Sequence, residues 1–172
     1  MLVLVVGPSG AGKDSLLNAA RQAFAGDPRI HFVRRVITRP PDPGGENHDA
    51  VTATEFTTRD FALSWSAHGL CYGIPMNAVN AARVVVASVS RGVIAEAARR
   101  FPVRVIEVTA PAGILAARLA ARGRESAADI AGRLARTAPI PAGVTVETVW
   151  NDATLERGAE RFIAALRAVL TQ

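Results

Sequence analysis

Short apolar runs alternate along the chain with segments in which apolar residues recur every three or four positions. The runs predict strands at residues 2–6, 31–37, 84–89, 103–109 and 145–150. The helical spacing predicts helices at residues 14–24, 92–101, 112–122, 127–136 and 154–170. Buried strands that alternate with amphipathic helices are typical of a parallel sheet covered on both faces. The pattern therefore predicts an α/β, three-layer fold with a five-stranded parallel core sheet.

Two segments interrupt this alternation. Residues 38–80 begin with several prolines and glycines and continue with short mixed segments. We interpret them as a small substrate-binding subdomain inserted into a single domain of residues 1–172, a length that suits one core. Residues 122–136 begin with an irregular Arg-Gly-Arg segment between two arginine-bearing helices, and they are predicted to form a lid.

The strongest local signal follows the first predicted strand, where residues 7–13 read Gly-Pro-Ser-Gly-Ala-Gly-Lys. Lys13 is the one lysine among the 20 basic residues of the chain. A Gly-rich turn between a strand and a helix forms a P-loop, whose backbone N–H groups cradle phosphates; a plain strand-to-helix turn is the alternative. The segment predicts binding of the β- and γ-phosphates, with Lys13 on the transferring phosphoryl group. The predicted phosphate-binding residues are Gly7, Pro8, Ser9, Gly10, Ala11, Gly12, Lys13, Asp14 and Ser15.

The residue after this lysine departs from the usual pattern. A Ser or Thr normally follows the lysine and binds Mg²⁺, whereas Asp14 stands there and Ser15 comes next. The third predicted strand also lacks the acidic residue that commonly serves Mg²⁺ in P-loop enzymes. We expect Asp14 and Ser15 to be the metal-binding residues; a helix-start carboxylate without a metal contact is the alternative for Asp14.

Arginines gather around the predicted lid. Guanidinium groups around a γ-phosphoryl group stabilise the charge that develops during its transfer. We therefore expect Arg122 and Arg133 to be catalytic and Arg118 to contact the triphosphate, while Arg124 and Arg136 fit solvated helix faces better.

The predicted insertion carries a third group of polar residues. Arg39, Asn47, His48 and Tyr72 offer hydrogen-bond donors suited to a phosphorylated sugar. Trp65 fits a core position better, and His68 is expected to be structural.

Charge and cysteine content narrow the class of partner. The net charge of +5 comes from scattered arginines without interleaved aromatics, which favours small phosphorylated ligands over nucleic acid. One cysteine excludes an internal disulfide, and no apolar stretch is long enough for a membrane span. We expect a cytoplasmic protein; whether it is a monomer or a homodimer stays open.

Across nearly its whole length the chain resembles the guanylate kinase family. The resemblance rests on the P-loop, the Thr38-Arg39 loop with its Gly-Glu, the Tyr72-Gly73 pair, the Arg-Gly lid and the late Trp-Asn-Asp. It implies a P-loop kinase fold, ATP and Mg²⁺ as cofactors, a lid that closes on binding, and Asn151 near the adenine.

The chain departs from that family where the acceptor is recognised. In guanylate kinases a glutamate nine residues before the tyrosine reads guanine, and here that position is Leu63; the second arginine of the phosphate clamp is Asp42. Without this glutamate the site lacks the hydrogen-bond acceptor that would pair with the polar edge of guanine, which argues against guanine as the ligand. The chain instead resembles the ribose 1,5-bisphosphate phosphokinase branch, which is associated with phosphonate breakdown. The resemblance lies in Gly-Lys-Asp-Ser-Leu, in Glu-Asn-His and in the segment from Leu63 to Gly73.

This resemblance implies transfer of phosphate from ATP to the 1-phosphate of ribose 1,5-bisphosphate, which gives 5-phosphoribosyl 1-diphosphate. The acceptor-binding residues that it implies are Thr38, Arg39, Glu46, Asn47, His48, Tyr72, Ser90 and Arg91. Two other functions stay open at this point: a guanylate or other nucleoside monophosphate kinase, and a non-catalytic guanylate-kinase-like binding module.

Overall fold

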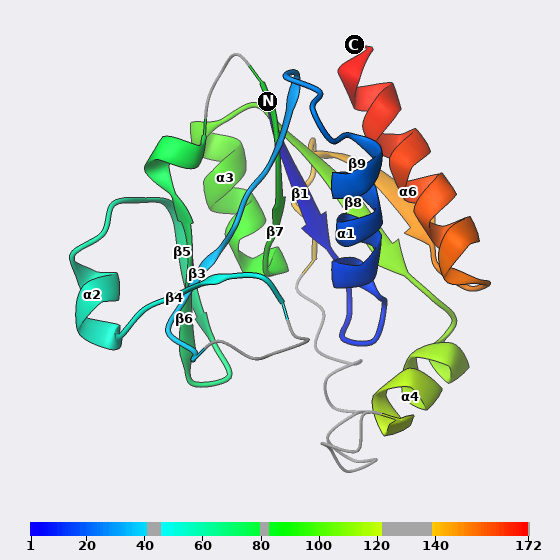
Figure 1. Ribbon diagram of the computed structural model, residues 1–172, viewed down its shortest axis with the longest axis horizontal. Coiled ribbons are helices and arrows are strands. Elements are labelled where there is room, and N and C mark those ends of the chain that lie inside the picture. The colour runs from blue at the N-terminus through cyan, green and yellow to red at the C-terminus, as the bar shows by residue number, and fades with distance from the viewer. Residues whose placement is uncertain (41–45, 80–82, 122–138, 172) are drawn as a thin grey trace.

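A computed structural model describes residues 1–40, 46–79, 83–121 and 139–171 (Figure 1). Five parallel strands form its central sheet, in the order β2-β7-β1-β8-β9. Their bounds are β1 Leu2–Val6, β2 Ile30–Phe32, β7 Val84–Ser88, β8 Val103–Thr109 and β9 Thr145–Trp150. The predicted α/β fold with a five-stranded parallel core sheet is therefore confirmed.

The two faces of this sheet are covered by different elements. Side chains alternate across a strand, so Val3 and Val5 of β1 point to one face, while Leu2 and Leu4 point to the other. The first face packs against α1 (Lys13–Ala23) and α6 (Leu155–Leu170). The second packs against α3 (Ile94–Arg100) and against apolar residues of a smaller sheet. Coverage on both faces explains why β1 is an uninterrupted apolar run.

The smaller sheet lies beside the core and has the strand order β4-β3-β6-β5 (Figure 1). Its strands are β3 Val36–Ile37, β4 Asp49–Ala50, β5 Phe61–Ala67 and β6 Leu70–Pro75. His68 and Gly69 join β5 to β6 in a two-residue turn, and both have positive φ angles, 52° and 73°. This conformation matches the twist of a tight hairpin. The short helix α2 (Ala53–Thr57) begins with a capping box between Thr52 and Glu55.

The remaining described elements connect these layers. They are the short turns η1 (Met76–Ala78) and η2 (Arg91–Val93) and the helix α4 (Ala112–Ala121). None of the helices in the described part of the chain is long and apolar enough to cross a membrane.

One predicted strand is wrong. Residues 31–37 form two strands in two sheets, because β2 pairs in parallel with β7 and β3 pairs antiparallel with β6. The chain changes sheets at Val33-Arg34-Arg35, where two charged residues interrupt the apolar run. An apolar run by itself cannot show which partner each half of it will find. The predicted helix 127–136 and the whole of the predicted lid, residues 122–136, lie outside the described residues.

Candidate active site

The P-loop connects the end of β1 to the start of α1. Gly12 caps α1 with a φ angle of 85°, a left-handed conformation that favours glycine. Lys13 is the first residue of the helix, and its ammonium group donates to the carbonyl oxygens of Gly7 at 2.8 Å and Pro8 at 3.0 Å. The backbone of this loop and the helix start together form an anion-binding end of α1.

Two residues distant in sequence hold the P-loop from outside. Asn151, at the end of β9, is 4% exposed, and its amide donates to the carbonyl oxygen of Ala11 at 2.8 Å. Arg118 of α4 donates to the carbonyl oxygen of Gly10 at 3.4 Å. Both predicted ATP-site residues therefore contact the P-loop backbone, and Asn151 supports it from the buried side.

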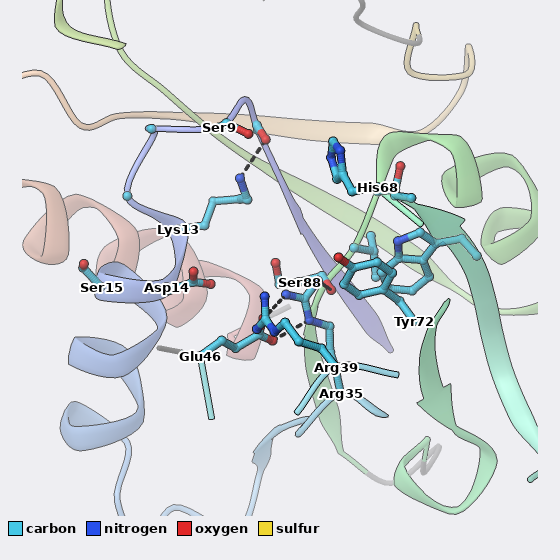
Figure 2. A pocket seen from close by; sticks show the side chains of 17 residues that line it. Ser9, Lys13, Asp14, Ser15, Arg35, Arg39, Glu46, His68, Tyr72 and Ser88 are labelled. Atoms are coloured by element: carbon cyan, nitrogen blue, oxygen red, sulfur yellow. Dashed lines mark hydrogen bonds and ion pairs between the residues drawn. The ribbon is translucent and has the colours of Figure 1, made fainter. Parts of the chain in front are cut away.

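A cavity of about 350 Å³ lies between the P-loop and the smaller sheet (Figure 2). The P-loop and the first turn of α1 line one side, the end of β7 lines the floor, and β5 and β6 line the opposite side. The predicted site residues that the cavity brings together are Gly7, Ser9, Gly10, Gly12, Lys13, Asp14, Ser15, Arg39, Glu46, Tyr72 and Ser90. A phosphate donor on the P-loop and an acceptor on the smaller sheet would meet in this space.

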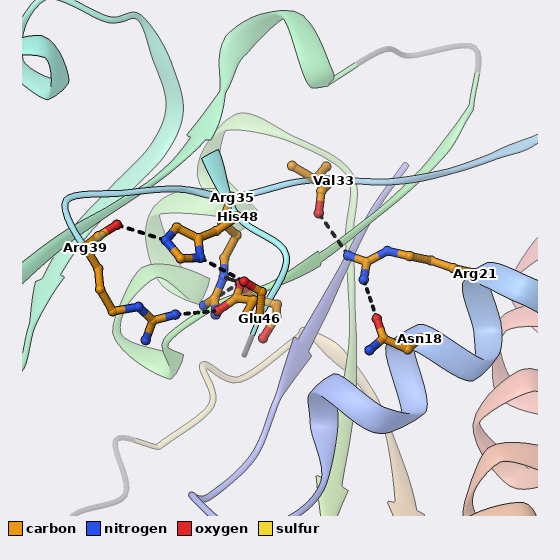
Figure 3. A network of polar contacts seen from close by, with 8 residues as sticks. Asn18, Arg21, Val33, Arg35, Arg39, Glu46 and His48 are labelled. Carbon is orange, nitrogen blue, oxygen red and sulfur yellow. Dashed lines mark hydrogen bonds and ion pairs between the residues drawn. The ribbon is translucent and has the colours of Figure 1, made fainter. Parts of the chain in front are cut away.

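An ion-pair network of Arg35, Arg39 and Glu46 lines part of the cavity (Figure 3). The carboxylate of Glu46 accepts from Arg35 Nε at 2.6 Å and from Arg35 Nη2, and it lies 3.9 Å from Arg39 Nη2. Arg35 also donates to the carbonyl oxygen of Ser88 at 3.3 Å. Glu46 thus acts as the shared counterion of two arginines, rather than as a free acceptor for a ligand.

The buried ring of His48 contacts the backbone of two residues of this network. Its Nδ1 lies 2.8 Å from the carbonyl oxygen of Glu46, and its Nε2 lies 3.0 Å from the carbonyl oxygen of Arg39. His48 does not line the cavity. The structure therefore places it as a support for Arg39 and Glu46.

Three other predicted acceptor residues lie away from the main cavity. The hydroxyl of Thr38 accepts from the backbone N–H of Cys71 at 2.9 Å and so joins β3 to β6. Arg91 forms an ion pair with Glu107 of β8. Asn47 lines a narrower neighbouring cavity.

Sequence reasoning missed Arg35, which lines the cavity. Trp65 packs against a core cluster, as expected of a core residue, and it also lines the cavity. His68, which we expected to be structural, stands in the β5–β6 turn with a positive φ angle and also lines the cavity. The Trp65 ring stacks on Tyr72 at 5.4 Å between centroids, with the planes 5° apart. Arg35 stands within an Arg34-Arg35 pair that precedes the Thr38-Arg39 loop, and this pair was the available signal.

The neighbouring cavity adds another arginine to this region. Arg21 of α1 donates to Asn18 at 2.9 Å and to the carbonyl oxygen of Val33 at 3.4 Å (Figure 3). Partial burial lowers the pKa of Arg21, while the nearby carboxylates of Glu46 and Asp14 raise it and Arg35 lowers it. An arginine keeps its charge at neutral pH, so Arg21 adds positive potential behind the Arg35–Glu46 pair.

The side-chain oxygens available for a metal ion suit Mg²⁺ that is bound mainly through phosphate oxygens. Asp14 and Ser15 both line the cavity at the start of α1. Within the described residues, no group of three or more His, Cys, Asp or Glu could hold a metal ion. Mg²⁺ commonly takes one or two protein oxygens together with phosphate oxygens and water, and these two side chains can supply such oxygens. Arg122 and Arg133, the predicted catalytic arginines, lie outside the described residues.

Several curated proteins are similar to this chain over nearly its whole length, although no protein-family model matches it. Ribose 1,5-bisphosphate phosphokinase PhnN of Acidiphilium cryptum is 55% identical over 169 residues, which cover 96% of this chain and 91% of that protein. The protein of the same name from Methylobacterium radiotolerans is 49% identical over 177 residues, which cover 97% of both.

A third relative is longer. The bifunctional ribose 1,5-bisphosphokinase-thymidine phosphorylase of Cupriavidus necator is 53% identical over 172 residues. The match covers 95% of this chain but 28% of that protein.

Solved structures show the same fold at low sequence identity. Guanylate kinase from Anaplasma phagocytophilum matches with a TM-score of 0.66 at 18% identity, over 100% of this chain and 87% of that one. A gluconokinase from Sinorhizobium meliloti matches with a TM-score of 0.55 at 14% identity, over 98% of this chain and 93% of that one.

Proposed function

This chain belongs to the ribose 1,5-bisphosphate phosphokinase family, and we propose that it transfers the γ-phosphoryl group of ATP to the 1-phosphate of ribose 1,5-bisphosphate. The products are ADP and 5-phosphoribosyl 1-diphosphate. One observation in the structure supports this reaction most directly: among the described residues, one cavity joins the P-loop to Arg35 and Arg39, and Leu63, at the position of the guanine-reading glutamate, is not part of its lining.

The donor side of the reaction is assigned to the P-loop. Its backbone N–H groups and Lys13 hold the β- and γ-phosphates, and the lysine ammonium offsets the charge on the transferring group. Asp14 and Ser15 are the residues that would hold Mg²⁺, which neutralises phosphate charge when bound. Arg122 and Arg133 are proposed, from the family resemblance, to complete the charge around the transferring group.

The acceptor side is assigned to the smaller sheet. Arg39 carries a side chain that is 36% exposed and lines the cavity, which supports its assignment to the reacting phosphate. Tyr72 lines the same wall and offers its hydroxyl to the sugar phosphate. An acceptor phosphate oxygen is ionised at neutral pH, so the reaction needs no general base and depends on positioning and electrostatics.

A nucleoside monophosphate kinase is the main competing function. The position of the guanine-reading glutamate is occupied by Leu63, which is 1% exposed and packs in the core cluster that also holds Ile74 and Val89. Leu63 can accept no hydrogen bond from a base, and the cavity wall beside it consists of the stacked Trp65 and Tyr72. This argues against guanine as the ligand. A non-catalytic module is disfavoured because Lys13 and the P-loop line the cavity.

The test is a comparison of acceptors. The purified protein is incubated with ATP, Mg²⁺ and one of three acceptors, ribose 1,5-bisphosphate, GMP or AMP. The release of ADP is followed, and phosphorus NMR identifies the product. We expect rapid turnover with the sugar bisphosphate and a diphosphate signal at the sugar. Rapid phosphorylation of GMP without turnover of the sugar bisphosphate would refute the proposal. Ligand binding without turnover of any acceptor would favour the non-catalytic module.

The compartment follows from the same proposal. We propose a reducing cytoplasm, where ATP is supplied, and the single cysteine, which can form no internal disulfide, is compatible with it.

A further inference from the structure

Arg35 lies deeper in the active-site region than Arg39. Its side chain is 14% exposed, compared with 36% for Arg39. It lines the main cavity and also the narrower cavity behind it, and the two share Asp14, Arg35, Glu46 and Ser88 among their walls. A ligand that extends from the P-loop past Arg39 would therefore reach the guanidinium of Arg35.

The guanidinium of Arg35 is held in one orientation. Nε and Nη2 donate to Glu46, Nη1 donates to the carbonyl oxygen of Ser88, and the group lies 5.4 Å from the Tyr72 ring centroid. A guanidinium has five N–H donors, and its contacts with the described residues use three of them. Arg35 is thus a preorganised cation with donors left for a further anion.

The charges around Arg35 are unbalanced. The described residues that line the two cavities include more cations than carboxylates: Lys13, Arg21, Arg35 and Arg39 against Asp14 and Glu46. Arg35 and Arg39 share the single carboxylate of Glu46, and the buried Nε of Arg39 has no hydrogen-bond partner within the described part of the chain. A bound phosphate would supply negative charge and acceptor oxygens to these groups.

The proposed acceptor carries two phosphates, which must bind at different places in the site. The 1-phosphate must lie next to the γ-phosphoryl group, near Lys13, and the sugar then projects the 5-phosphate away from the P-loop. Figure 2 shows Lys13 next to the P-loop and Arg35 away from it, beside Glu46 and Arg39. On the basis of the proposed function, we propose that Arg35 binds the non-reacting 5-phosphate and makes the enzyme selective for a bisphosphorylated sugar.

The first test measures binding without catalysis. Ribose 5-phosphate carries the distal phosphate but no reacting one, so calorimetric titration with it probes the Arg35 subsite alone. We expect Arg35→Gln to weaken its binding by about ten- to hundredfold, because a charged hydrogen-bonded contact is lost. The control Arg59→Gln removes the same charge from the same sheet region, at a surface ion pair with Asp49 outside both cavities, and should leave the affinity unchanged. Equal affinity in the wild type and Arg35→Gln, or no binding by the wild type at millimolar ligand, would overturn the proposal.

The second test separates recognition from a structural role. The value of kcat/KM is measured with ribose 1,5-bisphosphate and with ribose 1-phosphate, which lacks the distal phosphate. Arg35→Gln should lower kcat/KM for the bisphosphate by about tenfold or more and leave the value for ribose 1-phosphate nearly unchanged. An equal loss with both acceptors would mean that Arg35 supports the fold or the reacting phosphate, and would overturn the proposal.

A milder variant keeps the test usable if Arg35→Gln fails to fold. Arg35→Lys retains the charge but cannot form the bidentate contact with Glu46. It should show a smaller loss of kcat/KM with the same dependence on the distal phosphate.

The wild-type assay with ribose 1,5-bisphosphate tests the proposed function itself. Lack of that turnover, together with Arg35-dependent binding of ribose 5-phosphate, would refute the reaction and retain the subsite.

Discussion

The side-chain amide of Asn151 donates a 2.8 Å hydrogen bond to the carbonyl oxygen of Ala11, which joins the end of β9 to a P-loop 140 residues earlier. Glycines on two sides make room for this amide. A Cβ on Gly12 would lie 2.5 Å from Nδ2 of Asn151, and a Cβ on Gly158 would lie 2.3 Å from its Oδ1. The shape of the phosphate-binding loop therefore depends on close packing among the P-loop, β9 and α6.

Gly158→Ala should destabilise the protein, although the same change in a helix usually stabilises it. The added methyl group must displace the buried Asn151 amide, so we expect the free energy of unfolding to fall by about 1–3 kcal/mol. We also expect the KM for ATP to rise, because the P-loop loses its support. Urea unfolding and initial-rate kinetics measure the two effects.

Two further variants check this cause. Gly113 lies in α4 with no atom within 4 Å of an added Cβ, so Gly113→Ala should stabilise or leave stability unchanged. Combining Gly158→Ala with Asn151→Ala removes the clash, and the double variant should be more stable than the sum of the single losses predicts. Additive losses would show that Asn151 is not what Gly158 accommodates.

Lys13→Met should abolish turnover and leave the chain folded. The substitution removes a partly exposed side chain that donates to Gly7 and Pro8, while the apolar core of β1 and α1 is untouched. We expect kcat to fall by about 10²- to 10³-fold or more, since the cation acts on the charge of the transferring phosphoryl group. Thermal unfolding and circular dichroism verify the fold, and a fully active variant would disprove the role of Lys13.

Asp14→Asn should raise the Mg²⁺ concentration needed for half-maximal rate by about tenfold or more. The carboxylate lines the cavity at the first turn of α1, where it can contact a phosphate-bound metal ion. Asp60→Asn, at an exposed position outside the described cavities, is the control with the same chemical change. If Asp14 serves only the helix dipole, the Mg²⁺ dependence will stay unchanged and stability will fall by about 0.3–1 kcal/mol.

Glu46→Gln should destabilise the acceptor side of the site. Arg35 and Arg39 would lose the charge that they share, so we expect the free energy of unfolding to fall by about 1–3 kcal/mol. Added ribose 5-phosphate should recover part of this loss, because it brings negative charge to the same arginines. Glu160→Gln breaks an exposed ion pair with Arg157, and the same unfolding measurement should show a change of at most about 0.5 kcal/mol. Equal small losses in both variants would contradict the role assigned to Glu46.

The P-loop and the core strands could be predicted because their signals are local. The central strands β1 and β7 are apolar runs, β8 and β9 carry apolar residues between polar ones, and the residues of the phosphate-binding loop are neighbours in sequence. The run at 31–37 failed because its two halves pair with different strands, which no local pattern records. Asn151 was identified only through a family resemblance, and only the structure shows that it supports the loop from behind.

The sequence by itself determined the α/β layering and the phosphate loop with Lys13, since both follow from the spacing of residues along the chain. Only the tertiary structure decided which polar residues of the smaller sheet face the cavity. In the structure His48 and Thr38 contact the backbone of neighbouring segments instead of lining the cavity. Arg35, Trp65 and His68 line it. The physical reason is that exposure and ion pairing depend on long-range strand pairing, which places residues distant in sequence, such as Arg35, Glu46 and Ser88, within hydrogen-bond distance.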